Sequence, residues 1–160
     1  MLSFKDYNKT GCYVSVKPLS APVLNDYLFE LNKILTVNDD LHCTLIYDRK
    51  CQDYKTFINN ENKNSLYQSK PKDYMVYPGH DNAGYLVLKM ESVDLDNRHK
   101  ELRQLGLNHS FDDYLCHMTL ASCFGDCEEF KTKYLEKIKN IDLPDIILFS
   151  GETFESIKED

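Results

Sequence analysis

The sequence lacks the features that mark several common classes of protein. It has no stretch near 18 consecutive apolar residues and no basic segment leading into an apolar one at its start. We therefore expect neither a membrane span nor a secretory signal. None of its six cysteines stands in a Cys-x-x-Cys pair, which argues against a zinc ribbon. Without a signal peptide, these thiols are expected to stay reduced in a cytoplasm.

Basic residues are scarce as well. The 160 residues include 19 Lys and Arg against 26 Asp and Glu, which gives a net charge of −7. Proteins that bind long nucleic acid usually present a basic face, so this charge argues against a duplex or a long strand as partner. A small anionic ligand needs only a few local donors and remains compatible with the composition. The length and the 42% hydrophobic content predict one globular domain over residues 1–160.

The chain alternates between strand and helix patterns. Alternating apolar residues predict strands over 11–17, 41–47, 73–78, 83–90, 114–121 and 145–149. Helical spacing predicts helices over 22–35, 51–59, 94–105 and 127–139, and the polar stretch 60–71 is expected to be a loop. The two halves, about 11–78 and 83–150, each run strand, helix, strand, helix, strand. This repetition predicts two equivalent lobes around a pseudo-twofold axis.

A short motif occurs once in each half, at the same place in the repeat. It is His42-Cys43-Thr44-Leu45 in the first half and His117-Met118-Thr119-Leu120 in the second. Side chains alternate along a strand, so each copy points its His and its Thr to one face. Two imidazoles and two hydroxyls around one cleft would supply an acid, a base and a phosphate clamp. That set is sufficient for metal-free phosphodiester chemistry.

These paired motifs resemble those of the two-histidine (2H) phosphoesterases, and the resemblance covers about residues 11–150. The family includes enzymes that act on RNA 2′,3′-cyclic phosphates, on 2′-5′ oligoadenylates, and, in compact phage anti-CBASS proteins, on cyclic oligonucleotide signals. The small lobes look most like the phage group. The resemblance implies an α+β fold of two pseudo-symmetric β-α-β-α-β lobes, whose antiparallel sheets flank a central cleft. It also implies a reaction without cofactor or metal.

The catalytic roles follow from the same resemblance. His42 and His117 would be the general acid and base, because an imidazole titrates near neutral pH. Thr44 and Thr119 would donate hydrogen bonds to the non-bridging phosphate oxygens. One His would deprotonate a ribose 2′-hydroxyl for attack on phosphorus, and the other would protonate the leaving 5′-oxygen. Which His is the base stays open.

Substrate contacts are assigned to four further residues. Tyr13 stands where phage members use an aromatic to stack on a base, and a packed strand aromatic is an equally good interpretation. Glu152 looks similar to an acidic residue near the nucleotide in that group, although a solvated acid is the commoner role. Because Trp is absent, Phe154 and Tyr74 are the other candidates for stacking. The cations that would offset ligand charge are Lys17, Arg49 and Lys89.

The remaining histidines and cysteines receive no catalytic role. His80, His99 and His109 lack the motif and are expected at the surface. Cys123 and Cys127 could join His117 as metal ligands, but small buried side chains are the better interpretation, so no metal is predicted.

The leading hypothesis is an enzyme that cleaves cyclic di- or trinucleotide immune signals. One alternative is a 2H enzyme acting on RNA 2′,3′-cyclic phosphate ends or linear 2′-5′ oligoadenylates. A second is a cyclic-nucleotide sponge that binds without hydrolysis. A monomer is favoured.

Overall fold

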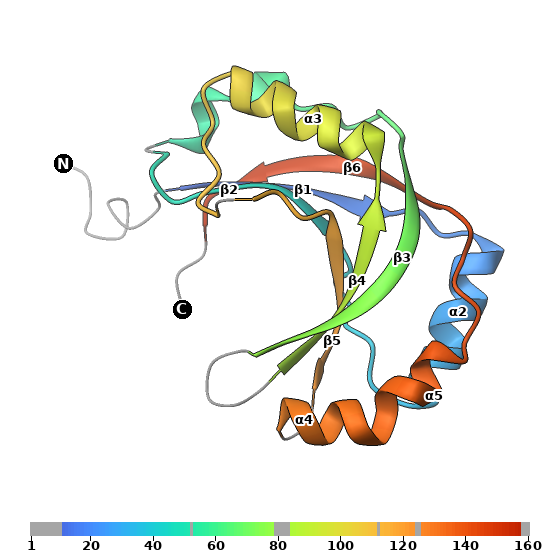
Figure 1. The fold of residues 1–160 in the computed structure, drawn as a ribbon. Coiled ribbons are helices and arrows are strands. Elements are labelled where there is room, and N and C mark those ends of the chain that lie inside the picture. Colours follow the sequence, from blue (N-terminus) through green and yellow to red (C-terminus); the bar gives the residue numbers. More distant parts are fainter. Residues whose placement is uncertain (1–10, 52, 79–83, 112, 124–125, 158–160) are drawn as a thin grey trace.

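The fold is taken from a computed structural model, which describes residues 11–51, 53–78, 84–111, 113–123 and 126–157. Its strands form one antiparallel sheet in the order β1-β2-β5-β4-β3-β6, and β6 returns to pair with β1 (Figure 1). The strands are β1 (Cys12–Pro18), β2 (Cys43–Asp48), β3 (Tyr67–Pro78), β4 (Gly84–Glu91), β5 (His117–Cys123) and β6 (Ile147–Glu155). A mixed α/β fold with antiparallel strands is therefore confirmed.

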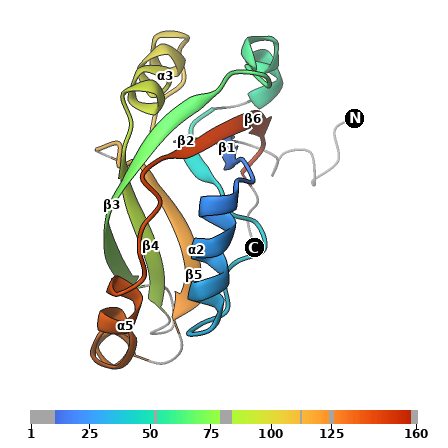
Figure 2. The same ribbon diagram turned by 90° about the vertical axis from the view of Figure 1, so that its right-hand side faces the viewer.

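Helices cover the outer side of the curved sheet (Figures 1 and 2). They are α2 (Pro22–Asn32), α3 (Val93–Gln104), α4 (Cys127–Phe130) and α5 (Glu136–Lys139), with a π turn, η4 (Lys131–Leu135), joining the last two. Pro22 starts α2, where its missing N–H costs no hydrogen bond, and the Ser92 hydroxyl caps α3 by accepting from Leu95 N at 3.0 Å. None of the described helices is long and apolar enough to cross a bilayer.

Three predicted elements differ from the structure, and one of them is the last strand, which was predicted over 145–149 and is β6 over Ile147–Glu155. Residues 51–59 form two short 3₁₀ turns, η1 (Tyr54–Thr56) and η2 (Ile58–Asn60), in place of one helix. The predicted loop 60–71 is wrong at its end, because β3 already begins at Tyr67. Tyr67, Ser69 and Pro71 are buried and their neighbours exposed, so this polar segment has the period-2 alternation of a strand. Its scarcity of β-branched residues hid that pattern.

The sheet is continuous where two separate sheets were expected. β2 and β5, the strands that carry the two motifs, meet through a single register pair, Cys43 with Met118. The two halves also pair through β3 with β4 and through β1 with β6. The opposite edges close through β3 and β6, where Tyr67 pairs with Phe149. The core fills the space between the sheet and the helices, and the fully buried Leu45, Leu120 and Phe149 belong to it.

Three of the four register shifts in the described sheet decide which face the side chains near the motifs and on β6 reach. On β2, Val14 pairs with Ile46 and Ser15 with Thr44, so Leu45 is an extra residue. On β5, Leu86 pairs with Ala121 and Val87 with Thr119, so Leu120 is the extra one. On β6, the register slips around Gly151, which adopts a positive φ of 67°. An inserted residue reverses the in-and-out alternation beyond it. The two His-x-Thr-Leu copies thus carry a bulge at the same leucine.

Candidate functional site

The two His-x-Thr steps lie on one face of the sheet, at the junction of β2 and β5. Cys43 and Met118, the central residues of the two steps, are fully buried and paired with each other. The flanking His and Thr of each step are only partly buried, as alternation requires. Extending this antiparallel register by one residue sets His42 opposite Thr119 and Thr44 opposite His117. Each histidine therefore lies across from the threonine of the other step.

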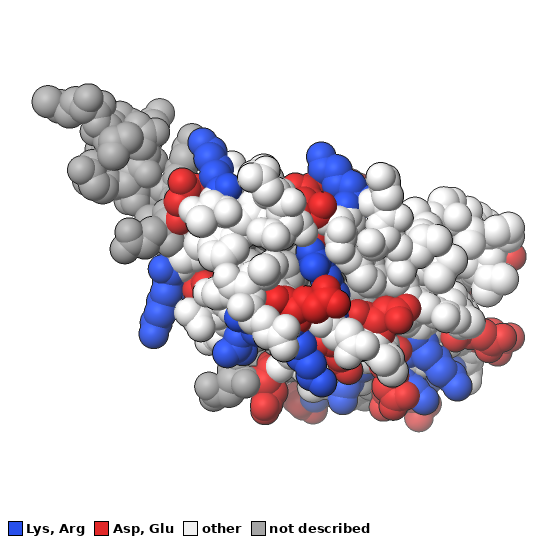
Figure 3. Space-filling view, turned by 90° about the horizontal axis from the view of Figure 1, so that it is seen from above, with Lys and Arg blue, Asp and Glu red and all other residues white. Residues whose placement is uncertain are grey.

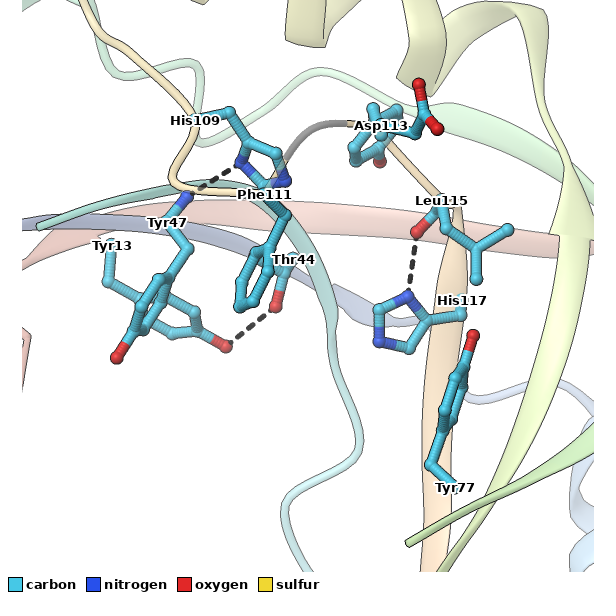
Figure 4. Close-up of a pocket in the computed structure, with 10 residues that line it drawn as sticks. Tyr13, Thr44, Tyr47, Tyr77, His109, Phe111, Asp113, Leu115 and His117 are labelled. Atoms are coloured by element: carbon cyan, nitrogen blue, oxygen red, sulfur yellow. Dashed lines mark hydrogen bonds between the residues drawn. The ribbon is translucent and has the colours of Figure 1, made fainter. Parts of the chain in front are cut away.

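Both imidazoles are held in the same way. His42 Nδ1 lies 3.0 Å from the carbonyl oxygen of Asp40, and His117 Nδ1 lies 2.7 Å from that of Leu115. In each case the acceptor belongs to the residue two positions before the histidine. Because a carbonyl oxygen only accepts, each Nδ1 carries the hydrogen, and in the neutral ring Nε2 keeps a lone pair. Figure 4 shows Nε2 of His117 turned away from Leu115 into the pocket.

A pocket of about 470 Å³ opens on this face. Tyrosine and phenylalanine rings dominate its walls, and an imidazole and a hydroxyl come from the two motifs (Figure 4). Its lining residues are Tyr13, Thr44, Tyr47, Tyr77, His109, Phe111, Asp113, Tyr114, Leu115 and His117. His42 and Thr119 are not among them.

Tyr13 connects His42 to this pocket. Its hydroxyl lies 3.1 Å from Thr44 Oγ1, and its ring meets the His42 ring edge to face at 5.9 Å between centroids. Burial raises the pKa of the Tyr13 phenol, so the hydroxyl stays protonated at neutral pH. The structure thus brings Tyr13, His42, Thr44 and His117 together. The Tyr13 ring packs against the His42 ring, so the two faces of the tyrosine are not both open for stacking on a base.

The sequence reasoning missed the pocket residues Tyr77 and Tyr114, and it also missed the packed aromatic pair of Tyr47 and Phe111. Their ring centroids lie 5.6 Å apart at 32°, with the Arg49 guanidinium 5.3 Å from the Tyr47 centroid. If the side chains of β2 alternated strictly from Thr44 onward, Tyr47 would point into the core. The bulge at Leu45 instead turns Tyr47 to the same face of the sheet as Thr44. The segment before Phe111 is tied to β2, because Ser110 N donates to the Tyr47 carbonyl at 2.8 Å. No local pattern marks Phe111 in the sequence.

The expectation that His99 and His109 are surface residues is wrong. His99 is 8% exposed, contacts the Leu45 carbonyl through Nδ1 at 2.7 Å, and stacks on the Tyr114 ring at 4.2 Å. His109 lines the pocket, and its Nδ1 accepts from Tyr47 N at 3.2 Å. Burial and the neighbouring His99 lower the pKa of His109 to about 4. His80 lies outside the described residues.

The low pKa of His109 predicts a pH-dependent stability. The unfolded chain binds this proton near pH 6.5, the ordinary value, and the folded protein only near pH 4. The unfolded state therefore binds more protons between these values, and the free energy of unfolding falls as the pH drops from 6.5 to 4. We expect a loss of roughly 1 kcal/mol from His109, allowing for solvent screening.

Urea denaturation at a series of pH values measures this dependence. His109→Asn is the informative variant, since its Oδ1 can accept from Tyr47 N without titrating. The variant should lose less stability than the parent protein over the same pH range. Equal losses in the two proteins would contradict the assignment to His109.

Three of the predicted substrate-contact residues lie away from the pocket. Glu152 is fully buried on the core side, where its carboxylate accepts from Arg98 Nη2 at 2.7 Å and from Arg98 Nε at 2.9 Å. Phe154 is 4% exposed and belongs to the hydrophobic core. Tyr74 is 8% exposed, and its hydroxyl bonds to that of Tyr27. The bulge at Gly151 turns Glu152 inward, whereas simple alternation from Phe149 would turn it to solvent.

The three candidate cations differ in their surroundings. Lys17 Nζ forms an exposed ion pair with Asp40 at 3.5 Å. Lys89 lies on β4, directly opposite His117 of the neighbouring strand β5. Arg49 packs over the Tyr47 and Phe111 rings beside the pocket.

On the face in Figure 3, seen from above α3, basic and acidic side chains are interspersed.

The cysteines behind the motifs form a small buried cluster. Cys43 Sγ lies 3.9 Å from both Cys116 Sγ and the Tyr114 hydroxyl. The contact with Cys43, together with burial, holds the pKa of the Cys116 thiol far above its usual value. In the part of the chain that the structure describes, no three His, Cys, Asp or Glu side chains gather as metal ligands.

Fold and site together define a small mixed α/β protein with paired His-x-Thr steps beside one aromatic pocket. Residues 10–160 match the family described as Anti-CBASS protein Acb1, and the chain belongs to that family. The Anti-CBASS protein Acb1 of Enterobacteria phage T4 is 32% identical over 130 residues, covering 78% of this chain and 80% of that protein. The protein of the same name from Yersinia phage phiR1-RT is 27% identical over 139 residues, covering 84% and 85%.

A third relative named Anti-CBASS protein Acb1, from Sphingomonas paeninsulae, is 29% identical over 132 residues. The match covers 80% of this chain and 20% of that longer protein. The resemblance to the phage anti-CBASS group is thereby confirmed.

Proposed function

We propose that this protein is a metal-independent phosphodiesterase that hydrolyses the 3′–5′ linkages of cyclic di- or trinucleotide immune signals. The matched placement of the two histidines carries the proposal. Each presents Nε2 from a ring fixed through Nδ1, and each lies across from the threonine of the other step. Fixed imidazoles on one face are what general acid–base chemistry at a single phosphate requires.

The reaction uses both histidines in turn. Nε2 of one ring accepts the proton of a ribose 2′-hydroxyl, whose oxygen attacks the adjacent phosphorus. The bond from phosphorus to the 5′-oxygen breaks, and the other imidazole protonates that leaving oxygen. The first product is a 2′,3′-cyclic phosphate, which the same pair then hydrolyses with water in reverse roles. Thr44 and Thr119 donate hydrogen bonds to the non-bridging oxygens, where negative charge grows in the transition state.

The proposal includes the 2H phosphoesterase fold, with 11–78 and 83–150 as pseudo-symmetric lobes of one domain. The strand order supports it, because exchanging β1 with β4, β2 with β5 and β3 with β6 leaves every pairing unchanged. The bulges at Leu45 and Leu120 support it further, since they occupy the same position in the two motifs.

The biological role follows from the family. An anti-CBASS protein of a phage would act in the cytoplasm of the infected host, with a small cyclic oligonucleotide as its partner. Cleaving that signal would stop the defence it activates.

Incubation with cyclic dinucleotides and trinucleotides in the presence of EDTA tests the reaction. We expect linear products that end first in a 2′,3′-cyclic phosphate and then in a phosphate monoester. In isotopically labelled water, only the second product should carry the label. Loss of activity with EDTA would overturn the metal-free mechanism, and recovery of intact ligand after denaturation would indicate a sponge. If the protein cleaved linear 2′-5′ oligoadenylates or RNA 2′,3′-cyclic phosphate ends but no cyclic oligonucleotide, the alternative 2H activity on those substrates would be favoured.

We propose Tyr47 and Phe111 as the surface on which a base of the substrate stacks. Phe111 is 55% exposed although it packs on Tyr47, so one side of this aromatic pair is available to a ligand. Stacking on an aromatic is worth roughly 1–3 kcal/mol per base, so Phe111→Ala is expected to raise KM by about 5- to 150-fold. Steady-state kinetics on a cyclic dinucleotide measures the change.

Phe29→Ala is the matched control for this substitution. Phe29 is 65% exposed on α2 and does not line the pocket, so its loss should leave KM unchanged. If both variants kept the parent KM, the base would not stack on Phe111.

A further inference from the structure

A second pocket lies beside the first one and is lined by three cationic side chains. Arg49 and Lys50 follow the end of β2, and Arg103 comes from the last turn of α3. The cavity measures about 480 Å³. In a chain with a net charge of −7, three cations around one cavity concentrate positive charge where a small anion can enter.

These cations have no described carboxylate within ion-pairing distance. Asp48 is the acidic residue of the pocket wall, and its two oxygens already accept from the backbone. Lys50 N donates to Oδ1 and Asn108 N donates to Oδ2, each at 2.9 Å. Asp48 is 2% exposed, so its charge faces these amides rather than the cavity. The positive charge of the pocket is therefore available to a ligand.

His109 lines both pockets. Its Nδ1 accepts from Tyr47 N, so the neutral ring carries its hydrogen on Nε2 as a donor. Ser110 adds a hydroxyl, which accepts from Arg49 N at 2.9 Å and can donate its own hydrogen. The His109 Nε2–H and the Ser110 hydroxyl are thus neutral hydrogen-bond donors that can bind an anion together with the cations.

We propose that this second pocket, lined by Arg49, Lys50 and Arg103, binds another phosphate of the substrate while one phosphate lies at His42 and His117. The role in turnover rests on the proposed function, whereas anion binding itself does not. A cyclic di- or trinucleotide carries a phosphate at each linkage, so it can occupy both positions at once. A dinucleotide with a single linkage has no second phosphate and cannot gain from the second position in this way. The pocket therefore selects substrates with several phosphates.

Inorganic phosphate provides the first test, in the His42→Ala/His117→Ala double variant, where the proposed reaction is removed. Backbone NMR shifts of Asn108 and Ser110 should move with phosphate and saturate. The same titration with Arg103→Gln and Lys50→Gln added should show at least a tenfold weaker response. Lys100→Gln is the matched control, because Lys100 is an exposed residue of α3 outside the pocket. Equal binding in all these proteins would overturn the proposal.

Kinetics provides the second test, in the protein with both histidines intact. Arg103→Gln should raise KM for a cyclic trinucleotide about tenfold, with kcat little changed and a weaker dependence on salt. Cleavage of a dinucleotide with one linkage should be unaffected. Equal losses on both substrates would overturn the proposal. No turnover of either substrate by the parent protein would instead refute the proposed function, while phosphate binding would still decide whether the pocket holds an anion.

Discussion

Replacing His117 with alanine is expected to lower kcat on a cyclic dinucleotide by about 10²–10⁴-fold, the usual contribution of a positioned acid or base. His42→Ala should have an effect of the same order, because each ring serves one proton transfer. The double variant should lose little more than either single one, since the acid and the base act as a unit. Single-turnover rates under saturating substrate measure these losses directly.

Binding should survive these substitutions, which separates catalysis from folding. Tyr47, Phe111 and the basic pocket remain in place, so the Kd measured by calorimetry should change by only a few-fold. Urea denaturation should show native-like stability, because both rings are partly exposed. Turnover that persisted in either alanine variant would refute the assignment of that histidine. If a variant lost substrate binding together with turnover, the replaced histidine would be a ligand contact rather than an acid or a base.

Breaking the Arg98–Glu152 pair is expected to have the largest effect on stability. Glu152 is fully buried and Arg98 is 6% exposed, and two hydrogen bonds of 2.7 and 2.9 Å join them. These bonds hold the pKa of the Arg98 guanidinium above its ordinary value. The carboxylate also accepts from the Tyr67 hydroxyl and from Asn62 N, each at 3.1 Å. Arg98→Met would leave this buried charge without its cation, at a cost of about 3–5 kcal/mol.

Two comparisons make this prediction specific. Lys33→Met breaks an exposed pair with Glu30, whose side chains are 57% and 50% exposed, and should cost less than about 1 kcal/mol. The double variant Arg98→Met/Glu152→Met removes both charges and should recover part of the loss, because neither ion is left unpaired. Urea denaturation measures all four proteins. A cost for Arg98→Met no larger than that for Lys33→Met would contradict the buried-pair account.

The elements that the sequence predicted correctly have strong local signals. Period-2 alternation over Cys12–Val16 and the Pro22 start of α2 depend on neighbouring residues alone, and both agree with the structure. The alternation within each His-x-Thr step is local too, and the burial of Cys43 and Met118 between partly exposed residues agrees with it. The polar start of β3 escaped prediction because its strand form depends on pairing with Leu148 and Phe149 of β6.

The rest of the pocket escaped prediction because its residues reach it through long-range pairing. Phe111 comes from a segment held on β2 by Ser110, which bonds to the Tyr47 carbonyl and to Arg49 N. Arg103 reaches the basic pocket only because α3 ends beside Lys50 and Asn108. The contacts with Tyr47, Arg49 and Lys50 join parts of the chain more than 50 residues apart, and no local spacing encodes them.

The sequence by itself determined most of the element order and two His-x-Thr steps that each share one face, because both follow from local periodicity. The antiparallel α/β class was an implication of the family resemblance. Only the tertiary structure decided which other side chains face the ligand. Bulges at Leu45 and Gly151 reverse the alternation along β2 and β6. They turn Tyr47 toward the motif histidines and Glu152 into the core against Arg98. Each bulge is set by register with a distant strand, so a single strand's sequence does not reveal it.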